Sequence, residues 1–231
     1  MSKLIILPGA GGDGSFFSAP IAKLKQAFDP QILVLDDQEN RHEMAEFVLK
    51  NAPEKFFLLG HSMGGWVAQE VAAEAPERVE KLILLSSWTG VKEENKRLLE
   101  LAIPAIKAGH LNDVVLAQRP KMIYPPKLED PKFLELLKYC QFRQPEEVYV
   151  RQLTAILKDY STKSLLDKIL SPTMIIHGRQ DELFPLSEQE ALRDGIKDAK
   201  LEIIEECGHL APIEQPQKLI SLIASFLHPS A

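Results

Sequence analysis

The chain has 231 residues, of which 45% are hydrophobic and 26% are charged, and its formal net charge is -6 at pH 7. This composition is typical of a globular protein long enough to bury a sizeable core. Acidic and basic residues are interspersed, so no extended positive field is expected, which argues against nucleic acid or an anionic membrane as the main partner. We expect a small-molecule substrate.

The sequence also gives no sign of export or membrane insertion. The first apolar run, Leu4 to Leu7, is shorter than the ~7–15 residues of a signal peptide. No apolar stretch approaches the ~20 residues of a membrane span. The two cysteines, Cys140 and Cys207, do not make a disulfide framework. We therefore predict a cytoplasmic protein, and the sequence leaves its oligomeric state open.

In chain order, short apolar runs alternate with helical patterns, which is typical of parallel strands joined by crossover helices. The strands are predicted at Leu4 to Leu7, Ile32 to Leu35, Phe56 to Leu59, Leu82 to Leu85, Met174 to Ile176 and Leu201 to Ile204. The helices of this part are predicted at Phe16 to Phe28, Glu43 to Lys50, Met63 to Ala75 and Leu219 to Leu227. The expected fold is α/β, with a mostly parallel sheet of about six strands flanked by helices.

The middle of the chain differs, because residues 87–171 contain no convincing strand. Helical patterns lie around Glu94 to Lys107, Phe133 to Phe142 and Glu146 to Tyr160. Arg119-Pro120 and Tyr124-Pro125-Pro126 are expected to break this interval into short helices. We predict a core formed by residues 1–86 and 172–231, with residues 87–171 inserted as a helical cap.

The segment Gly60-His61-Ser62-Met63-Gly64-Gly65 carries the strongest chemical signal. A predicted strand precedes it and a helix follows, as a nucleophile on a sharp strand-to-helix turn requires. Gly60 and Gly64 supply the small neighbours that this turn needs, and the start of the helix can stabilise negative charge. We predict Ser62 as the nucleophile and the Met63 N–H as the first oxyanion donor. A chance glycine turn is the alternative.

A serine nucleophile needs a histidine base nearby in the fold. His209 follows the last predicted strand through Gly208 and precedes the closing helix, so its loop opens at the same sheet edge as Ser62. His61 adjoins Ser62 but is expected to point elsewhere and to pack. His177 ends a strand, where it could also simply pack. We therefore predict His209 as the base.

The acid that orients the base should stand on a neighbouring loop at the same edge. Asp181 follows the strand Met174 to Ile176 and gives the chain order serine, aspartate, histidine that is described for this nucleophile turn. Glu182 is its main rival. Asp181 is preferred.

At these residues the chain resembles the α/β-hydrolase superfamily, through GHSMGG, HGRQDELFP and CGHLAPIEQP. The likeness is to capped esterases, lactonases, carbon–carbon bond hydrolases and menaquinone-biosynthesis lyases. It implies the nucleophile, acid and base roles for Ser62, Asp181 and His209. It also implies a second oxyanion donor, the Ala10 N–H, although Pro8 replaces the histidine usual in that loop. The two leading antiparallel strands of many relatives are missing, which predicts a minimal sheet.

The glycines of PGAGGDG could instead suggest a phosphate loop, but the segment lacks both the GK[ST] ending and the GxGxxG spacing. The expected reaction is acyl transfer from an ester, thioester or lactone to water, and it needs neither a metal nor an organic cofactor. A lyase or carbon–carbon bond hydrolase of the same fold is the first alternative. A binding protein that has lost catalysis is the second.

Large side chains in the predicted cap are candidates to line an apolar acyl pocket. They are Trp88, Met122, Tyr124, Phe142 and Tyr149, with Tyr139 as a further aromatic residue. These side chains could instead only hold the cap helices together. Arg119, Lys121, Arg143 and Arg151 lie in the same region and could bind a substrate carboxylate, or could be ordinary surface residues.

Overall fold

The computed structural model describes residues 1–90, 93–141 and 143–228. Its centre is a sheet of six strands, all paired in parallel, in the order β2-β1-β3-β4-β5-β6. The strands are β1 (Lys3–Leu7), β2 (Asp29–Ile32), β3 (Phe56–His61), β4 (Val79–Leu85), β5 (Thr173–Gly178) and β6 (Lys200–Ile204). The predicted fold class is confirmed.

Strand β2 begins and ends three residues earlier than the sequence predicts. The predicted run, Ile32 to Leu35, is apolar because Leu33 and Leu35 are buried in the core as the chain leaves the sheet. The Leu33 N–H still donates to the Ile6 carbonyl at 3.1 Å. The apolar run therefore identifies buried residues correctly, but the position of the strand predicted from it is wrong.

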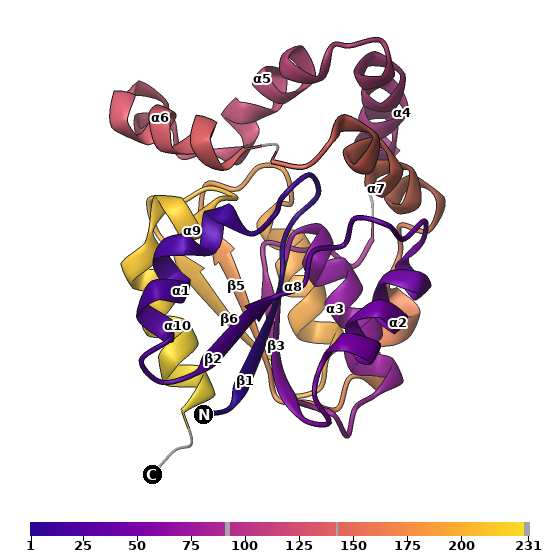
Figure 1. Ribbon diagram of the computed structural model, residues 1–231, viewed down its shortest axis with the longest axis vertical. Coiled ribbons are helices and arrows are strands. Elements are labelled where there is room, and N and C mark those ends of the chain that lie inside the picture. The colour runs from indigo at the N-terminus through magenta and orange to yellow at the C-terminus, as the bar shows by residue number, and fades with distance from the viewer. Residues whose placement is uncertain (91–92, 142, 229–231) are drawn as a thin grey trace.

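Helices cover both faces of this sheet (Figure 1). One layer consists of α2 (Arg41–Asn51), α3 (Met63–Glu74) and α8 (Leu186–Gly195), whose apolar side chains join one core cluster. The other consists of α1 (Ser18–Leu24) and α10 (Pro216–Leu227), which bury Leu24, Leu219 and Ile223 in a second cluster. The central strands β1, β3, β4 and β5 contain the fully buried runs, which explains the unbroken apolar stretches there.

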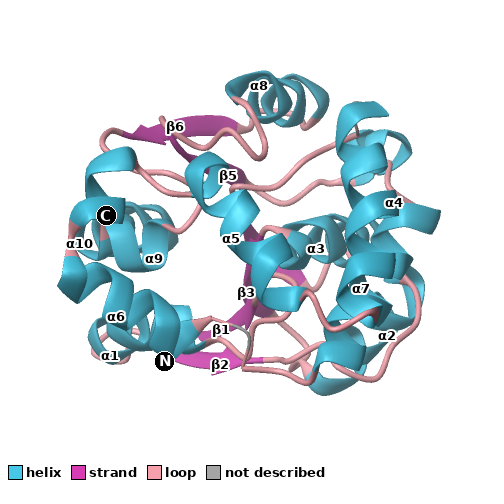
Figure 2. Ribbon diagram, turned by 90° about the horizontal axis from the view of Figure 1, so that it is seen from above, coloured by secondary structure: helices cyan, strands magenta, loops and turns pink. Residues whose placement is uncertain are grey.

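Four further helices lie above the carboxyl ends of the strands, as Figures 1 and 2 show, and we call them the cap helices. They are α4 (Glu93–Lys107), α5 (Leu111–Met122), α6 (Pro131–Cys140) and α7 (Glu146–Lys158). The described part of the chain also contains three short 3-10 turns, η1 (Ser15–Phe17), η2 (Pro125–Glu129) and η3 (Lys163–Lys168), and the one-turn helix α9 (Ala211–Glu214).

The predicted break at Arg119-Pro120 is wrong, because Pro120 lies inside α5. The helix continues to Met122, and the Ile123 N–H donates to the Arg119 carbonyl at 3.0 Å. A proline in the last turn removes one helical hydrogen bond where the helix is about to end. The break falls instead at Tyr124-Pro125-Pro126, as predicted. No helix of the described residues has both the length and the apolar character of a membrane span.

Candidate active site

Ser62 stands at a sharp turn between β3 and α3. Its φ of 53° and ψ of -119° lie outside the regions that side-chain-bearing residues normally adopt. The Ser62 N–H donates to the Leu85 carbonyl at 2.9 Å, and the Ser62 carbonyl accepts from the N–H groups of Gly65 and Trp66. Hydrogen bonds to β4 and to the first turn of α3 thus hold this turn, and the strained backbone conformation is that of the residue predicted as nucleophile.

Two glycines make this turn possible because backbone atoms occupy the space that a side chain would need. A Cβ added at Gly60 would lie 2.3 Å from the Gly64 carbonyl oxygen. One added at Gly64 would lie 2.1 Å from the Leu7 carbonyl oxygen. Strands β1 and β3 therefore close around the start of α3 only with glycine at both positions.

His209 and Asp181 form a buried pair on the loops after β6 and β5. Asp181 Oδ2 lies 2.7 Å from His209 Nδ1, and its other oxygen accepts from the N–H groups of Leu183 and Phe184 at 3.0 and 3.2 Å. A carboxylate is an acceptor, so Nδ1 carries the proton and Nε2 is left free to act as a base. Only 3% of Asp181 and 2% of His209 is exposed. Burial makes this charge-assisted bond an effective anchor for the imidazole ring.

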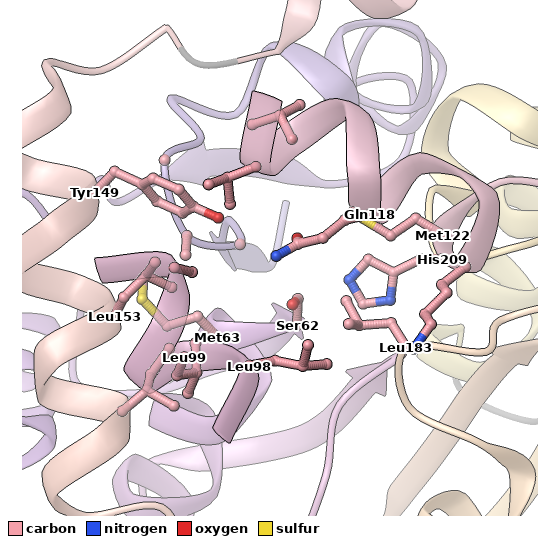
Figure 3. Close-up of a pocket in the computed structure, with 18 of the residues that line it drawn as sticks. Ser62, Met63, Leu98, Leu99, Gln118, Met122, Tyr149, Leu153, Leu183 and His209 are labelled. Carbon is pink, nitrogen blue, oxygen red and sulfur yellow. The ribbon is translucent and has the colours of Figure 1, made fainter. Parts of the chain in front are cut away.

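The close-up in Figure 3 shows Ser62 and His209 facing the same cavity, with the serine hydroxyl directed into it. The hydroxyl makes no hydrogen bond to His209 among the described residues. Such bonds are often long in unliganded sites and tighten when substrate binds. We refer to Ser62, His209 and Asp181 together as the candidate triad.

His61 contacts His209 directly. Its Nε2 donates to the His209 carbonyl at 3.0 Å, and the two imidazole rings lie 5.0 Å apart. Burial, reinforced by the nearby His209, lowers the pKa of His61 to about 3, so its ring stays neutral. As predicted, His61 packs against the site and does not face the nucleophile.

The two predicted oxyanion donors belong to residues near the nucleophile, Met63 directly after it and Ala10 in the loop after β1. The Met63 N–H belongs to the first residue of α3, where helix N–H groups lack intrahelical partners. Ala10 follows Gly9, where an added Cβ would be 3.3 Å from Ser62 Cβ. Both residues line the same cavity as Ser62.

Two glutamines near or within the cap hold the loop that contains Ala10. Gln152 accepts from the Gly11 N–H at 2.7 Å through Oε1 and donates to the Leu35 carbonyl at 2.5 Å through Nε2. Gln144 donates to the Gly12 carbonyl at 2.6 Å. Because Gln152 is buried in α7, the position of this loop depends on the cap.

The cavity above the candidate triad has a volume of about 510 Å³ and a mostly apolar lining. Trp88, Met122 and Tyr149 line it, as predicted. Tyr124, also predicted to line it, is not among the lining residues; it follows the end of α5 by two positions, and its N–H donates to Glu214 of α9. Phe142 lies outside the described residues.

The four basic residues considered as carboxylate ligands have different surroundings. Arg119 donates to Gln141 at 3.0 Å, Arg143 faces Asp13 at 3.7 Å, and Arg151 donates to the Asp36 carbonyl at 2.6 Å. These three arginines do not line the cavity, whereas Lys121 does.

The comparison with known proteins agrees with this geometry. The profile of the family described as "Serine aminopeptidase, S33" matches residues 34–216. The chain belongs to this family of α/β-hydrolases. The resemblance predicted from GHSMGG, HGRQDELFP and CGHLAPIEQP is confirmed, and the chain is an α/β-hydrolase enzyme.

Among named relatives, human monoacylglycerol lipase ABHD6 is 30% identical over 213 residues, covering 84% of this chain and 61% of its own length. The rat protein of the same name is 29% identical, with 58% of its length covered. This S33-family chain thus spans about three fifths of the length of these relatives. RutD of Rhizobium rhizogenes is 26% identical, covering 98% of this chain and 93% of its own.

Solved structures confirm the fold of this S33-family chain. A thermophilic esterase from Thermogutta terrifontis has a TM-score of 0.85 at 20% identity, covering 98% of this chain and 89% of its own. The enol-lactonase from Burkholderia xenovorans LB400 has a TM-score of 0.84 at 16% identity, covering 98% and 91%. At these identities the similarity establishes the architecture alone.

Three polar residues of the site were not predicted from the sequence of this S33-family chain: Gln118, Gln152 and Glu214. Gln118 points from α5 into the cavity above Ser62 (Figure 3). Gln152 and Glu214 are buried and bind backbone groups of the loops that contain Ala10 and His209. The one available signal was the position of Glu214 within CGHLAPIEQP, five residues after His209.

One group of side chains elsewhere has ligand atoms that could approach a metal ion. Nitrogen and oxygen atoms of His42, Glu70 and Glu74 lie within 4.8 Å of one another on α2 and α3. Glu70, however, already forms a salt bridge with Arg41. The Arg41 guanidinium therefore already pairs with this carboxylate. The group of three side chains is also separate from the cavity of the candidate triad.

Proposed function

We propose that the protein is a carboxylic ester hydrolase that forms an acyl-enzyme on Ser62. The observation that carries this proposal is the 2.7 Å bond between Asp181 and His209 beside the strained Ser62 turn. In this arrangement Asp181 fixes the imidazole so that Nε2 faces the cavity as a free base.

In the proposed reaction, Ser62 Oγ attacks the ester carbonyl carbon while His209 Nε2 takes the hydroxyl proton. The N–H groups of Ala10 and Met63 stabilise the oxyanion that forms. His209 then gives the proton to the departing alcohol, which leaves the acyl group on Ser62. A water molecule, deprotonated by His209, attacks the acyl carbon, and the proton passes from His209 to Ser62 Oγ as the acyl–oxygen bond breaks and the acid leaves.

The cavity favours a substrate with a small to medium apolar acyl group, and Lys121 is the basic residue among the four candidates that lines it. Its lining is dominated by aliphatic side chains from α4, α5 and α7, such as Leu99, Val115 and Leu153. The three cap arginines are engaged elsewhere, so they offer no carboxylate site at the cavity wall. A site of this kind binds by shape and apolar contact, with few polar groups to set orientation.

Gln118 is the polar group best placed to orient the substrate in this proposal. Its amide projects into the cavity above Ser62 (Figure 3). There it can donate to an oxygen on the alcohol side of the ester. We expect Gln118→Leu to raise KM for esters of polar alcohols and to change KM little for esters of apolar alcohols.

The test of the function is a panel of activated aryl esters with short, medium and long acyl chains. We expect a burst of the aryl alcohol, close to one equivalent of enzyme, followed by slower turnover, with neither phase in Ser62→Ala. Turnover without any covalent intermediate would instead favour base chemistry of the lyase type. Absence of both turnover and covalent labelling in folded protein would contradict the proposal.

A further inference from the structure

Glu214 is a buried carboxylate that binds the backbone on both sides of His209. Its Oε1 accepts from the Leu210 N–H at 2.9 Å, and its Oε2 accepts from the Gly208 N–H at 3.0 Å. Only 3% of Glu214 is exposed. The residues before and after the base are therefore tied to one side chain.

The same carboxylate also binds the cap. Oε2 accepts a third hydrogen bond, from the Tyr124 N–H at 2.8 Å, and Tyr124 follows the last residue of α5 by two positions. Glu214 lies in α9, far from Tyr124 in sequence, so this bond joins the end of a cap helix to the loop of the base.

Backbone bonds beside Glu214 reinforce this junction. The His209 N–H donates to the Met122 carbonyl at 2.6 Å, and the Glu182 N–H, next to Asp181, donates to the Lys121 carbonyl at 2.9 Å. Gly208 leaves room for this approach, since an added Cβ would lie 2.3 Å from the Met122 carbonyl oxygen. The end of α5 thus contacts the loops of both base and acid.

We propose that Glu214 is a positioning residue that fixes His209 and couples its placement to the cap. The inference rests on the proposed function in that His209 is taken as the base. Three N–H donors converge on two oxygens, which is the pattern that an ionised carboxylate satisfies best. A residue that only stabilised α9 would need no bond to Tyr124, which lies outside that helix.

Two opposing effects act on the pKa of the Glu214 carboxyl, which is raised overall. Burial raises the pKa of the Glu214 carboxyl, whereas the bonds from Tyr124, Gly208 and Leu210 oppose that shift. These donors are the groups through which the proposed coupling runs. Loss of the cap contact would remove one of the bonds that favour the charged form.

Glu214→Gln tests the carboxylate, because an amide has one acceptor oxygen and directs two N–H donors toward backbone N–H groups. We expect the rate of Ser62 labelling by a fluorophosphonate to fall by ~10–100-fold, the scale of a misplaced catalytic group. Hydrogen–deuterium exchange should rise in two peptides, around residues 120–125 and 206–211. Glu202→Gln, an exposed carboxylate on β6, is the matched control.

Exchange that rises only around residues 206–214 would overturn the coupling to the cap, and an unchanged labelling rate would overturn the positioning role. Because exchange does not depend on catalysis, it separates this inference from the proposed function. If the wild-type protein is not labelled at all, the proposed function is contradicted. Whether exchange rises in both peptides of Glu214→Gln then still tests the coupling between the His209 loop and the cap.

A second pair of variants keeps the test informative if Glu214→Gln does not fold. Tyr124 has a φ of -54°, which proline adopts, and Ile123 before it is extended with a φ of -122° and ψ of 137°. Tyr124→Pro removes the N–H that binds Glu214, whereas Tyr124→Ala keeps it. We expect faster exchange at residues 206–211 and slower labelling in the proline variant than in the alanine variant. Equal exchange at residues 206–211 and equal labelling rates in the two variants would overturn the link to the cap.

Discussion

The carboxyl edge of the sheet and the cap helices contribute to the same cavity in different ways. At the sheet edge, backbone atoms pack so closely that Gly60 and Gly64 cannot carry a Cβ, and Ser62 is held in a strained conformation. In the cap, aliphatic side chains of α4, α5 and α7 face the cavity, and many residues could supply similar volume.

This difference implies that the sheet edge carries out the chemical step and that the cap lining determines which substrate is selected. A reacting group must be placed within a fraction of an ångström, which backbone packing and buried hydrogen bonds can do. An acyl chain needs only apolar space of the right length. We therefore expect changes at the sheet edge to abolish reaction and changes in the cap lining to redirect it.

The largest effect should come from the candidate triad. Replacing Ser62, His209 or Asp181 by alanine should lower kcat on an activated ester by ~10³–10⁶-fold, and double variants should lose little more, because the three groups act as a unit. Steady-state kinetics of the single and double variants measure this. If His209→Ala kept more than about a tenth of the activity, the base would be misassigned.

A second comparison sets buried His61 at the sheet edge against exposed His110 in the cap. The pKa of His61 is about 3 in the folded chain, and an unfolded histidine titrates near ~6.5. Between these values the unfolded chain binds the proton and the folded chain does not. The free energy of unfolding should therefore fall as pH drops through this window, by up to about 5 kcal/mol from this residue.

Urea denaturation across the window checks this effect in His61→Gln, which keeps an N–H donor for the His209 carbonyl and does not titrate. Its stability should depend less steeply on pH than that of the wild type. His110→Gln, at an exposed histidine of the cap, is the control. Parallel curves for His61→Gln and wild type would show that His61 does not resist protonation.

Alanine substitutions at Gly64 and Gly109 compare backbone packing at the sheet edge with that in the cap. Alanine at Gly64 would place Cβ 2.1 Å from the Leu7 carbonyl oxygen, whereas at Gly109, in the cap turn with a φ of +88°, no heavy atom lies within 4 Å. Gly109→Ala should cost ~1–2 kcal/mol of stability from backbone strain alone. Gly64→Ala should cost more and should also slow Ser62 labelling. Equal losses of stability and labelling in the two variants would contradict the close packing at the nucleophile turn.

The smallest effect should come from the cap lining. Leu153→Ala enlarges the cavity, and we expect kcat/KM to shift toward longer acyl chains by ~1–3 kcal/mol while Ser62 labelling is retained. Leu136→Ala, on the exposed face of α6, is the control. An unchanged chain-length profile in Leu153→Ala would show that this part of the cap does not select the substrate.

The elements that sequence could predict are those set by contiguous patterns. The buried parallel strands appear as apolar runs, and the turn at Ser62 is encoded by glycines at fixed spacing beside it. Asp181 and His209 follow strands directly, so the sheet topology brings their loops to one edge. Strand β2 was misplaced because Leu33 and Leu35 are buried without being in the strand.

The residues that sequence could not predict act through contacts between distant parts of the chain. Gln152 binds Gly11 across 141 positions, and Glu214 binds Tyr124 across 90. No local pattern specifies such partners. Likewise, the aromatic character of Tyr124 gave no information on whether its side chain faces the cavity.

The most direct test of the central claim is the site of covalent labelling by a fluorophosphonate. We predict that intact-protein mass spectrometry will find one added group per wild-type chain and that peptide mapping will place it on Ser62. Ser62→Ala should remain unlabelled, and His209→Ala should react more slowly by orders of magnitude. Labelling of another residue, or equal labelling of folded Ser62→Ala, would contradict Ser62 as the nucleophile.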